Sequence, residues 1–294
     1  MSKADIYTHV TNSIIASIEA GQTGEKFILP WQGQTLSLPV NHTTLKQYRG
    51  INIPMLWASQ MEQGFSASIW ASYKQWEERG CQVRKGQKGT PIVYWGTIDI
   101  EPVDDNEEAS KRMFARYSHV FNADQVDGVE SPAPTEASSP LERISNADVF
   151  LASTGADIRY GGNRAFYRRD EDFIALPDPQ AFIDTPTSTA QENFYSTALH
   201  ELTHWSGAPH RMNRTKGKQF GDKDYAFEEL VAELGAAMLC ASLSIVNDPR
   251  LDHAQYIDNW LHALASDPKY IFLAASQAQK AADYLHSLQP VAQM

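Results

Sequence analysis

The segment TALHELTHWSGAPHRMNR, residues 197–214, constrains the fold more than any other part of the chain. It contains HExxH within the longer spacing HExxHxxGxxH. On a helix of 3.6 residues per turn, His200 and His204 lie about 40° apart, so both imidazoles can reach one ion at about 2.0–2.1 Å. Glu201 is rotated by about 100° from His200, which predicts a general base acting on water rather than a ligand. The motif predicts a helix that carries a metal centre.

The alternative is that the two histidines only pack or hydrogen-bond on a helix surface. Burying three polar side chains among apolar neighbours is costly unless a partner satisfies them, which favours a metal. The apolar neighbours are Ala198, Leu199, Leu202 and Trp205. A capping box of Thr189 and Glu192 predicts the start of the helix, and Gly207 is expected as the residue that follows its end.

Catalytic zinc usually has three protein ligands and one open position. His210 would complete the metzincin spacing, but that class needs a methionine turn below the metal, and Met212 lies too close while Met238 lies inside a helix. Glu229 is the rival, on a nearly apolar helix where a buried carboxylate needs a partner. We therefore expect Glu229 as the third ligand, with Glu233 orienting a histidine; His210 remains the alternative.

This set predicts zinc-dependent peptide hydrolysis, in which Glu201 takes a proton from the attacking water and returns it to the leaving amine. A further donor is needed for the developing negative charge, and Tyr195, Tyr225 or an unliganded His210 are candidates. Glu228 is expected to be a solvated acid in the first turn of its helix. Mn²⁺ or Co²⁺ would also accept a site of two histidines and a glutamate.

The whole chain predicts an α+β protein of two domains. Residues 128–140, GVESPAPTEASSP, lack large apolar side chains and are expected to link a mixed α/β domain at 1–127 to a mostly helical domain at 141–294. Helices are expected near 3–20, 50–62, 67–79, 141–154, 190–206, 223–243, 252–265 and 269–287. Strands are expected within 81–100 and 113–126, and a hairpin at 157–177 turning at 161–163.

Two cysteines without CxxC spacing argue against both a disulfide framework and a thiolate zinc site, so we expect a cytoplasmic location. No run of 18 apolar residues occurs, and no membrane span is expected. The net charge of −11 disfavours a protein coated in nucleic acid, although the sum hides local patches.

Residues 40–95 form such a patch, with seven cations, three anions and a net charge of +4. Cations interleaved with aromatic rings are typical of surfaces that bind single-stranded nucleic acid by stacking. The alternative is that the rings fill a small core and the cations cover a solvated face. The candidate contacts are Lys46, Tyr48, Arg49, Trp57, Trp70, Lys74, Trp76, Arg84, Lys85 and Lys88; Tyr73 and Tyr94 belong to the same interleaved set.

Several segments resemble the ArdC family of plasmid antirestriction proteins, whose N-terminal domain also begins TraC-type primases. These are YRGINIPMLW, VRKGQKGTPIVYW and VFNADQ in the first half, and FYSTALHELTHWSGAPHRMNR, YAFEELVAELGAAML and YIDNWLHAL in the second. The resemblance implies a single-stranded DNA-binding domain followed by a zincin-like metallopeptidase domain, and protection of incoming plasmid DNA during conjugation. It places HExxH on His200, Glu201 and His204, and a gluzincin-like carboxylate on Glu229.

The leading hypothesis is an antirestriction protein that binds single-stranded DNA and brings a zinc peptidase to a DNA-bound target, such as a host restriction protein. A second hypothesis is a DNA-masking protein whose metal is structural or is not needed for protection. A third is a peptidase with an N-terminal protein-interaction domain, which predicts no salt-dependent DNA binding.

Overall fold

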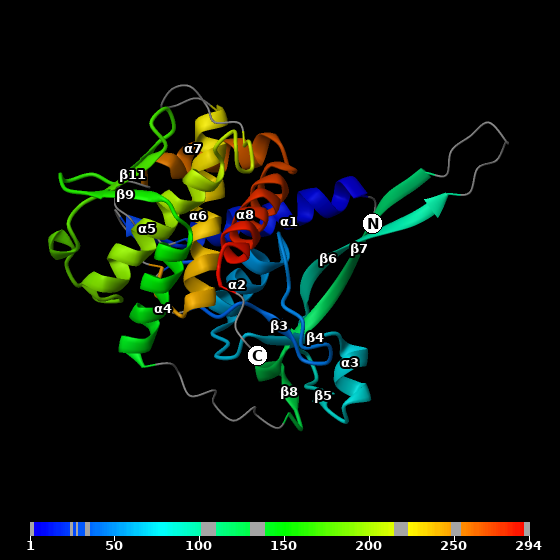
Figure 1. The fold of residues 1–294 in the computed structure, drawn as a ribbon. Helices are drawn as coiled ribbons and strands as arrows, with labels where there is room; N and C mark the ends of the chain where they lie inside the picture. Colours follow the sequence, from blue (N-terminus) through cyan, green and yellow to red (C-terminus); the bar gives the residue numbers. More distant parts are fainter. Residues whose placement is uncertain are drawn as a thin grey trace.

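The computed structural model describes residues 3–23, 26–27, 29–32, 36–100, 110–129, 139–214, 223–247 and 254–290. Within these ranges it confirms the expected α+β fold (Figure 1). Of the predicted linker, residues 130–138 lie outside the described residues, so the boundaries at 127 and 141 stay predictions.

The first half of the chain folds around a mixed four-stranded sheet in the order β3-β4-β7-β6. β6 pairs along its whole length with residues 110–120 of β7, and Figure 1 shows the far end of this pair projecting away from the helices. Residues 67–79, expected as one helix, divide into a strand, in which buried Trp70 pairs with Asn122, and a short helix. The elements are α1 (Lys3–Ala20), β1 (Gln22–Thr23), β2 (Lys26–Phe27), β3 (Val40–Asn41), α2 (Asn52–Gln63), β4 (Ile69–Ala71), α3 (Tyr73–Glu78), β5 (Gln82–Val83), β6 (Thr90–Ile100), β7 (Ser110–Asn122), a 3-10 turn at Ala123–Gln125 and β8 (Val126–Asp127).

The second half is mostly helical, as expected. α6 packs against both α5 and α8, and a three-stranded sheet in the order β10-β11-β9 lies beside α5 (Figure 1). The hairpin expected at 157–177 is wrong, because β11 lies between β9 and β10 and pairs with β9 in parallel. The elements are α4 (Pro140–Ser153), β9 (Asp157–Tyr160), β10 (Phe166–Arg168), β11 (Phe173–Leu176), a 3-10 turn at Pro179–Ala181, α5 (Ala190–Ser206), α6 (Lys223–Leu243), α7 (Ala254–Ser266) and α8 (Tyr270–Ser287).

The largest hydrophobic cluster of the described residues spans both halves of the chain, while two smaller clusters lie within the first half. The apolar face of α1, with Ile6, Val10, Ile14 and Ile18 all buried, belongs to the same cluster as the buried residues of α5, α6 and α8. Polar contacts also cross between the halves: the Thr11 hydroxyl donates to the Pro268 carbonyl at 2.7 Å. The first half therefore packs against the helices that carry HExxH. Among the described residues, no helix is both long and apolar enough to cross a membrane.

Candidate metal centre

The HExxH helix begins and ends where its sequence predicts, but Gly207, the residue after its end, is required for a different reason than expected. The Thr189 hydroxyl accepts from the Glu192 amide at 3.2 Å, and the Glu192 carboxylate accepts from the Thr189 amide at 3.1 Å. Gly207 caps the C-terminus with φ −80°, outside the left-handed region that favours glycine. A Cβ at Gly207 would lie 2.9 Å from the Arg214 guanidinium, so the absence of a side chain leaves room for that arginine.

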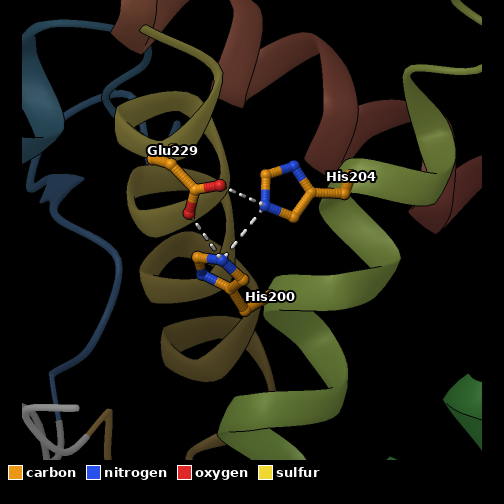
Figure 2. A group of neighbouring side chains, drawn as sticks. All are labelled: His200, His204 and Glu229. Carbon is orange, nitrogen blue, oxygen red and sulfur yellow. Dashed lines mark hydrogen bonds and ion pairs between the residues drawn. The ribbon is translucent and has the colours of Figure 1, made fainter. Parts of the chain in front are cut away.

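The structure brings His200, His204 and Glu229 together between α5 and α6 (Figure 2). The two histidine Nε2 atoms are 3.2 Å apart, and the Glu229 oxygens lie 3.5 Å from His200 Nε2 and 3.6 Å from His204 Nε2. Ligands about 2.0–2.1 Å from one ion in a tetrahedron are about 3.3–3.4 Å apart. The two imidazole nitrogens therefore have the separation that one small divalent cation requires, and one donor atom from each of the three buried side chains lies within 4.8 Å of the others.

A second carboxylate lies behind His204. Glu228 Oε1 is 3.2 Å from His204 Nδ1, and Arg214 donates to both Glu228 oxygens at 2.9 and 3.2 Å. Glu228 is only 3% exposed, which corrects the expectation of a solvated first-turn acid. Its partners explain how it is buried: the guanidinium neutralises the carboxylate, and His204 uses the remaining hydrogen-bonding capacity.

Glu233 takes the corresponding place behind His200. Its Oε2 lies 3.6 Å from His200 Nδ1, and its Oε1 accepts a short hydrogen bond from Gln32 Nε2. The expected role of Glu233 in orienting a histidine is consistent with this geometry. Nothing local in the sequence points to Gln32, because its partner is 201 residues away.

The carboxylates are held in the form that binds metal. Burial alone raises the pKa of Glu229, but the imidazoles of His204 and His200 outweigh it and lower the pKa well below the usual range. Burial also raises the pKa of Glu228, and His204 and Arg214 again lower it. Both groups are therefore ionised at neutral pH, as metal ligation and support of a ligand require.

Glu201 lies beside His200 on α5 and is 4% exposed. Successive residues of a helix point about 100° apart, so Glu201 and His200 leave α5 in different directions. The structure therefore keeps Glu201 next to the cluster without making it one of the three donors.

The three candidate transition-state donors, His210, Tyr195 and Tyr225, differ in their relation to the metal cluster. His210 is outside the cluster, with a largely exposed side chain whose Nε2 is 3.2 Å from Asp172 Oδ2. The Tyr195 hydroxyl donates to Asp148 on α4 at 2.5 Å, which occupies its proton away from the three donors. Burial raises the pKa of Tyr225, and neighbouring Glu229 and Tyr256 raise it further. Of these three, Tyr225 is the one whose hydroxyl interacts with the candidate ligand Glu229.

The nucleic-acid candidates need one correction. Trp57, Trp70 and Trp76 are 0% exposed, so their rings belong to the core and have no free face for a base. Tyr48 is partly buried, and its hydroxyl accepts from Asn41 at 3.0 Å. The candidate cations are all exposed, although three of them form ion pairs. These cations are Lys46, Arg49, Lys74, Arg84, Lys85 and Lys88, with Arg49 paired to Asp283, Lys74 to Glu78 and Arg84 to Asp127.

Two aromatic rings of the same segment are exposed. Tyr73 is 46% exposed and Tyr94 is 60% exposed. Tyr73, Arg84 and Lys85 line one open hollow of about 650 Å³. Residues 84–88 form a basic turn beside this hollow, and Gln125 holds both of its ends. The Gln125 side chain donates to the Lys88 carbonyl at 2.9 Å, and the Gln125 carbonyl accepts from the Arg84 amide at 3.0 Å.

Both halves of the chain match known families. Residues 4–121 match the family described as the N-terminal domain of anti-restriction factor ArdC, and residues 145–277 match a family of zincin-like metallopeptidases. Over 300 residues the chain is 44% identical to uncharacterized protein y4eC of Sinorhizobium fredii (strain NBRC 101917 / NGR234), covering 98% of this chain and 94% of that protein. It is also 36% identical to DNA primase TraC of Escherichia coli, covering 96% of this chain and 27% of the primase.

Solved structures agree across both halves. The metal-free crystal structure of the antirestriction protein ArdC from plasmid R388 is 40% identical with a TM-score of 0.76, covering 97% of each chain. The Mn(II)-bound structure of that protein is 38% identical with a TM-score of 0.75, covering 98% of this chain and 99% of that one. Because this similarity extends over nearly the full length of both proteins, the chain belongs to the ArdC family of antirestriction proteins.

Proposed function

We propose that this chain binds single-stranded DNA through its first half and hydrolyses peptide bonds at the cluster on α5 and α6. Both activities would serve to protect incoming plasmid DNA from restriction in the cytoplasm during conjugation. The observation that carries the peptidase assignment is the convergence of three buried donor side chains, His200, His204 and Glu229, beside Glu201. A protein component of a restriction system, bound near the same DNA, is the proposed peptide substrate.

His200, His204 and Glu229 hold the divalent ion in this proposal. Zn²⁺ is the expected metal, and the Mn(II) present in the R388 ArdC structure supports Mn²⁺ as an alternative. The ion would supply Lewis-acid polarisation of the scissile carbonyl and activation of water. Glu201 accepts the proton of the attacking water and transfers it to the leaving amine. Tyr225, whose hydroxyl interacts with Glu229, is the proposed donor to the developing oxyanion once the substrate displaces that contact.

The exposed cations and rings of residues 40–95 support single-stranded DNA as the nucleic-acid ligand. A base stacks on Tyr73 in the hollow while Arg84 and Lys85 contact the backbone phosphates. The relationship to the N-terminal part of a DNA primase also supports nucleic-acid binding. Lys46 and Lys88 are exposed cations of the same segment and are further candidate phosphate contacts.

A Glu201→Gln variant separates catalysis from the other functions. It should still bind metal and DNA, but should lose cleavage of restriction subunits in the presence of single-stranded DNA. Protection should fall as well, measured as the ratio of plasmid transfer into restricting and non-restricting recipients. Full protection by Glu201→Gln would favour the DNA-masking alternative, in which the metal is structural. The absence of cleavage by the wild-type protein would contradict the peptidase assignment.

A second experiment tests the DNA surface. Tyr73→Ala and Lys85→Ala should each weaken binding of a fluorescent oligonucleotide. Lys85→Ala should also reduce the slope of log affinity against log salt by about 0.7, as expected for one lost phosphate contact on a single strand. Exposed Tyr160 and Lys280, in the second half, provide matched controls when replaced by alanine. Equal loss in the control variants, or no loss in either test variant, would exclude this surface.

A further inference from the structure

The first half of the chain contributes a side chain to the surroundings of the metal cluster. Gln32 lies in the segment Leu29–Gln32, which precedes the DNA-binding surface, and is 2% exposed. Its Nε2 donates to Glu233 Oε1, while the other oxygen of Glu233 lies 3.6 Å from His200 Nδ1. A continuous series of contacts therefore leads from Gln32 through Glu233 to His200.

The orientation of the Gln32 amide follows from its second hydrogen bond. The Leu29 backbone amide donates to Gln32 Oε1 at 3.2 Å, so the NH₂ group is the part that faces Glu233. If the amide were reversed, Gln32 would present its oxygen to Glu233 and could not donate a hydrogen bond to that carboxylate. The local backbone thus presents a donor to the acid behind His200.

The segment that carries Gln32 is itself anchored to the HExxH helix. Asn247 Nδ2 donates to the Trp31 carbonyl at 3.1 Å, and the Ser196 hydroxyl donates to Asn247 Oδ1 at 2.9 Å. Ser196 lies on α5, one turn before His200, and the Trp31 side chain is fully buried. Gln32 is therefore held in place relative to the histidine that it reaches through Glu233.

We propose that Gln32 is a positioning residue for the metal centre. By donating to one oxygen of Glu233, its amide fixes the other oxygen against His200 Nδ1 and so directs His200 Nε2 toward Glu229 and His204. His204 is supported differently, because Arg214 neutralises Glu228 there. A neutral amide orients Glu233 without neutralising its charge, which keeps His200 a strong ligand.

The test is the affinity of the full-length protein for Zn²⁺ and Mn²⁺, measured by competition with a chelator. Gln32→Met has nearly the same length and no donor, and we expect it to bind metal about 10–100-fold more weakly, the usual effect of losing such support. Gln32→Glu should bind more weakly still, because two carboxylates then face each other. If Gln32→Met fails to fold, Gln32→Asn provides the same comparison with a shortened donor.

Gln60→Met is the matched control. Gln60 is also buried and accepts from the Ser68 hydroxyl at 3.0 Å, and it lies on α2, whereas the cluster lies on α5 and α6. The absorption bands of the Co²⁺-loaded protein, which report ligand geometry, should change in Gln32→Met and not in Gln60→Met. Melting of the metal-free variants separates a general loss of stability from an effect on metal.

A double-mutant cycle with Glu233→Gln tests whether Gln32 acts through Glu233. The two substitutions should be strongly non-additive in metal affinity, because each breaks the same series of contacts. Three results would overturn the inference. They are wild-type metal affinity in Gln32→Met, equal losses of affinity in Gln32→Met and Gln60→Met, and additive effects of Gln32→Met and Glu233→Gln. The inference rests on the proposed metal site, whose own failure would be recognised by the absence of metal binding in the wild-type protein.

Discussion

At the scale of single residues, aromatic side chains of the same segment differ in burial. Tryptophans in a basic segment suggested stacking on bases, yet Trp57, Trp70 and Trp76 are core residues. Tyr73 and Tyr94 from the same segment keep exposed faces. Composition cannot distinguish these rings, because a small domain must fill its core with the same aromatic residues that a stacking surface uses.

Metal content distinguishes the two candidates for the third ligand. We expect Glu229→Ala to lose stoichiometric metal after purification, because it removes one of three converging donors. His210→Ala should retain it, since His210 lies outside the cluster beside Asp172. Elemental analysis per chain gives the answer. Loss of metal in His210→Ala, with retention in Glu229→Ala, would restore the metzincin interpretation.

Arg214 provides a second prediction at this scale. Its guanidinium is buried against Glu228, so Arg214→Ala leaves a buried carboxylate without its cation. Breaking such a pair typically costs about 3–5 kcal/mol. Urea unfolding with a chelator present should show a loss of this size, and Arg214→Lys should recover only part of it because it lacks the two-pronged geometry. Arg84→Ala breaks an exposed pair and should change stability by less than about 1 kcal/mol.

At the scale of helices, the site depends on how closely α5 approaches α6. Gly235 on α6 faces Thr203 on α5, and a Cβ at Gly235 would lie 2.6 Å from Thr203 Cγ2. The missing side chain lets the two helices pack with Glu229 opposite His200 and His204. Gly235 is therefore a packing residue of the metal centre although it is not a donor.

Gly235→Ala should lower both stability and metal affinity. Overpacking typically costs about 1–3 kcal/mol, which exceeds the gain of about 1 kcal/mol from the higher helix propensity of alanine. Thermal unfolding of the metal-free protein and a metal titration measure the two effects. A second substitution, Thr203→Ala, removes the clashing atoms and should restore both properties. No loss in Gly235→Ala, or no rescue by Thr203→Ala, would contradict this account of the packing.

Helices were more predictable from sequence than sheet pairing, for a physical reason. The capping box of Thr189 and Glu192 and the apolar run of α6 are local signals, and both helices form as expected. The pairing of β9 with β11 instead of β10 depends on contacts between distant residues, which alternation of side chains does not specify. The same limit applies to Gln32, whose partner is defined only by the folded chain.

At the scale of the whole molecule, the shared core links the two halves. A Pro- and Ser-rich segment suggested a linker between separate domains, but hydrophobicity alone does not reveal that α1 packs with the helices of the second half. Arg49 pairs with Asp283, and the Gly50 amide donates to Gln279 at 3.0 Å, which adds polar contacts to the same interface. Stability added at the metal centre should therefore reach the first half.

This expectation can be measured with tryptophan fluorescence. Five of the seven tryptophans lie in the first half, and replacing Trp205 and Trp260 by phenylalanine leaves fluorescence that reports on that half alone. The helices that dominate the circular dichroism lie mostly in the second half. Metal at about 100 times its Kd should stabilise the folded state by about 2.7 kcal/mol. Because the cluster that contains Trp31 and Trp57 extends into the second half, the fluorescence and dichroism transitions should coincide and shift together. The tryptophans of the first half are Trp31, Trp57, Trp70, Trp76 and Trp95.

Two results would argue against this coupling. One is a fluorescence transition that stays in place when metal is added, and the other is a separation of the two transitions in the metal-free protein. A Glu229→Ala variant supplies the control, since it keeps the shared core but should lack the metal-dependent shift. In the wild-type protein, the fluorescence and dichroism transitions should coincide and shift to higher stability with metal. In Glu229→Ala they should coincide without this shift. That pair of results would mean that the metal bound between α5 and α6 stabilises the half of the chain proposed to bind DNA.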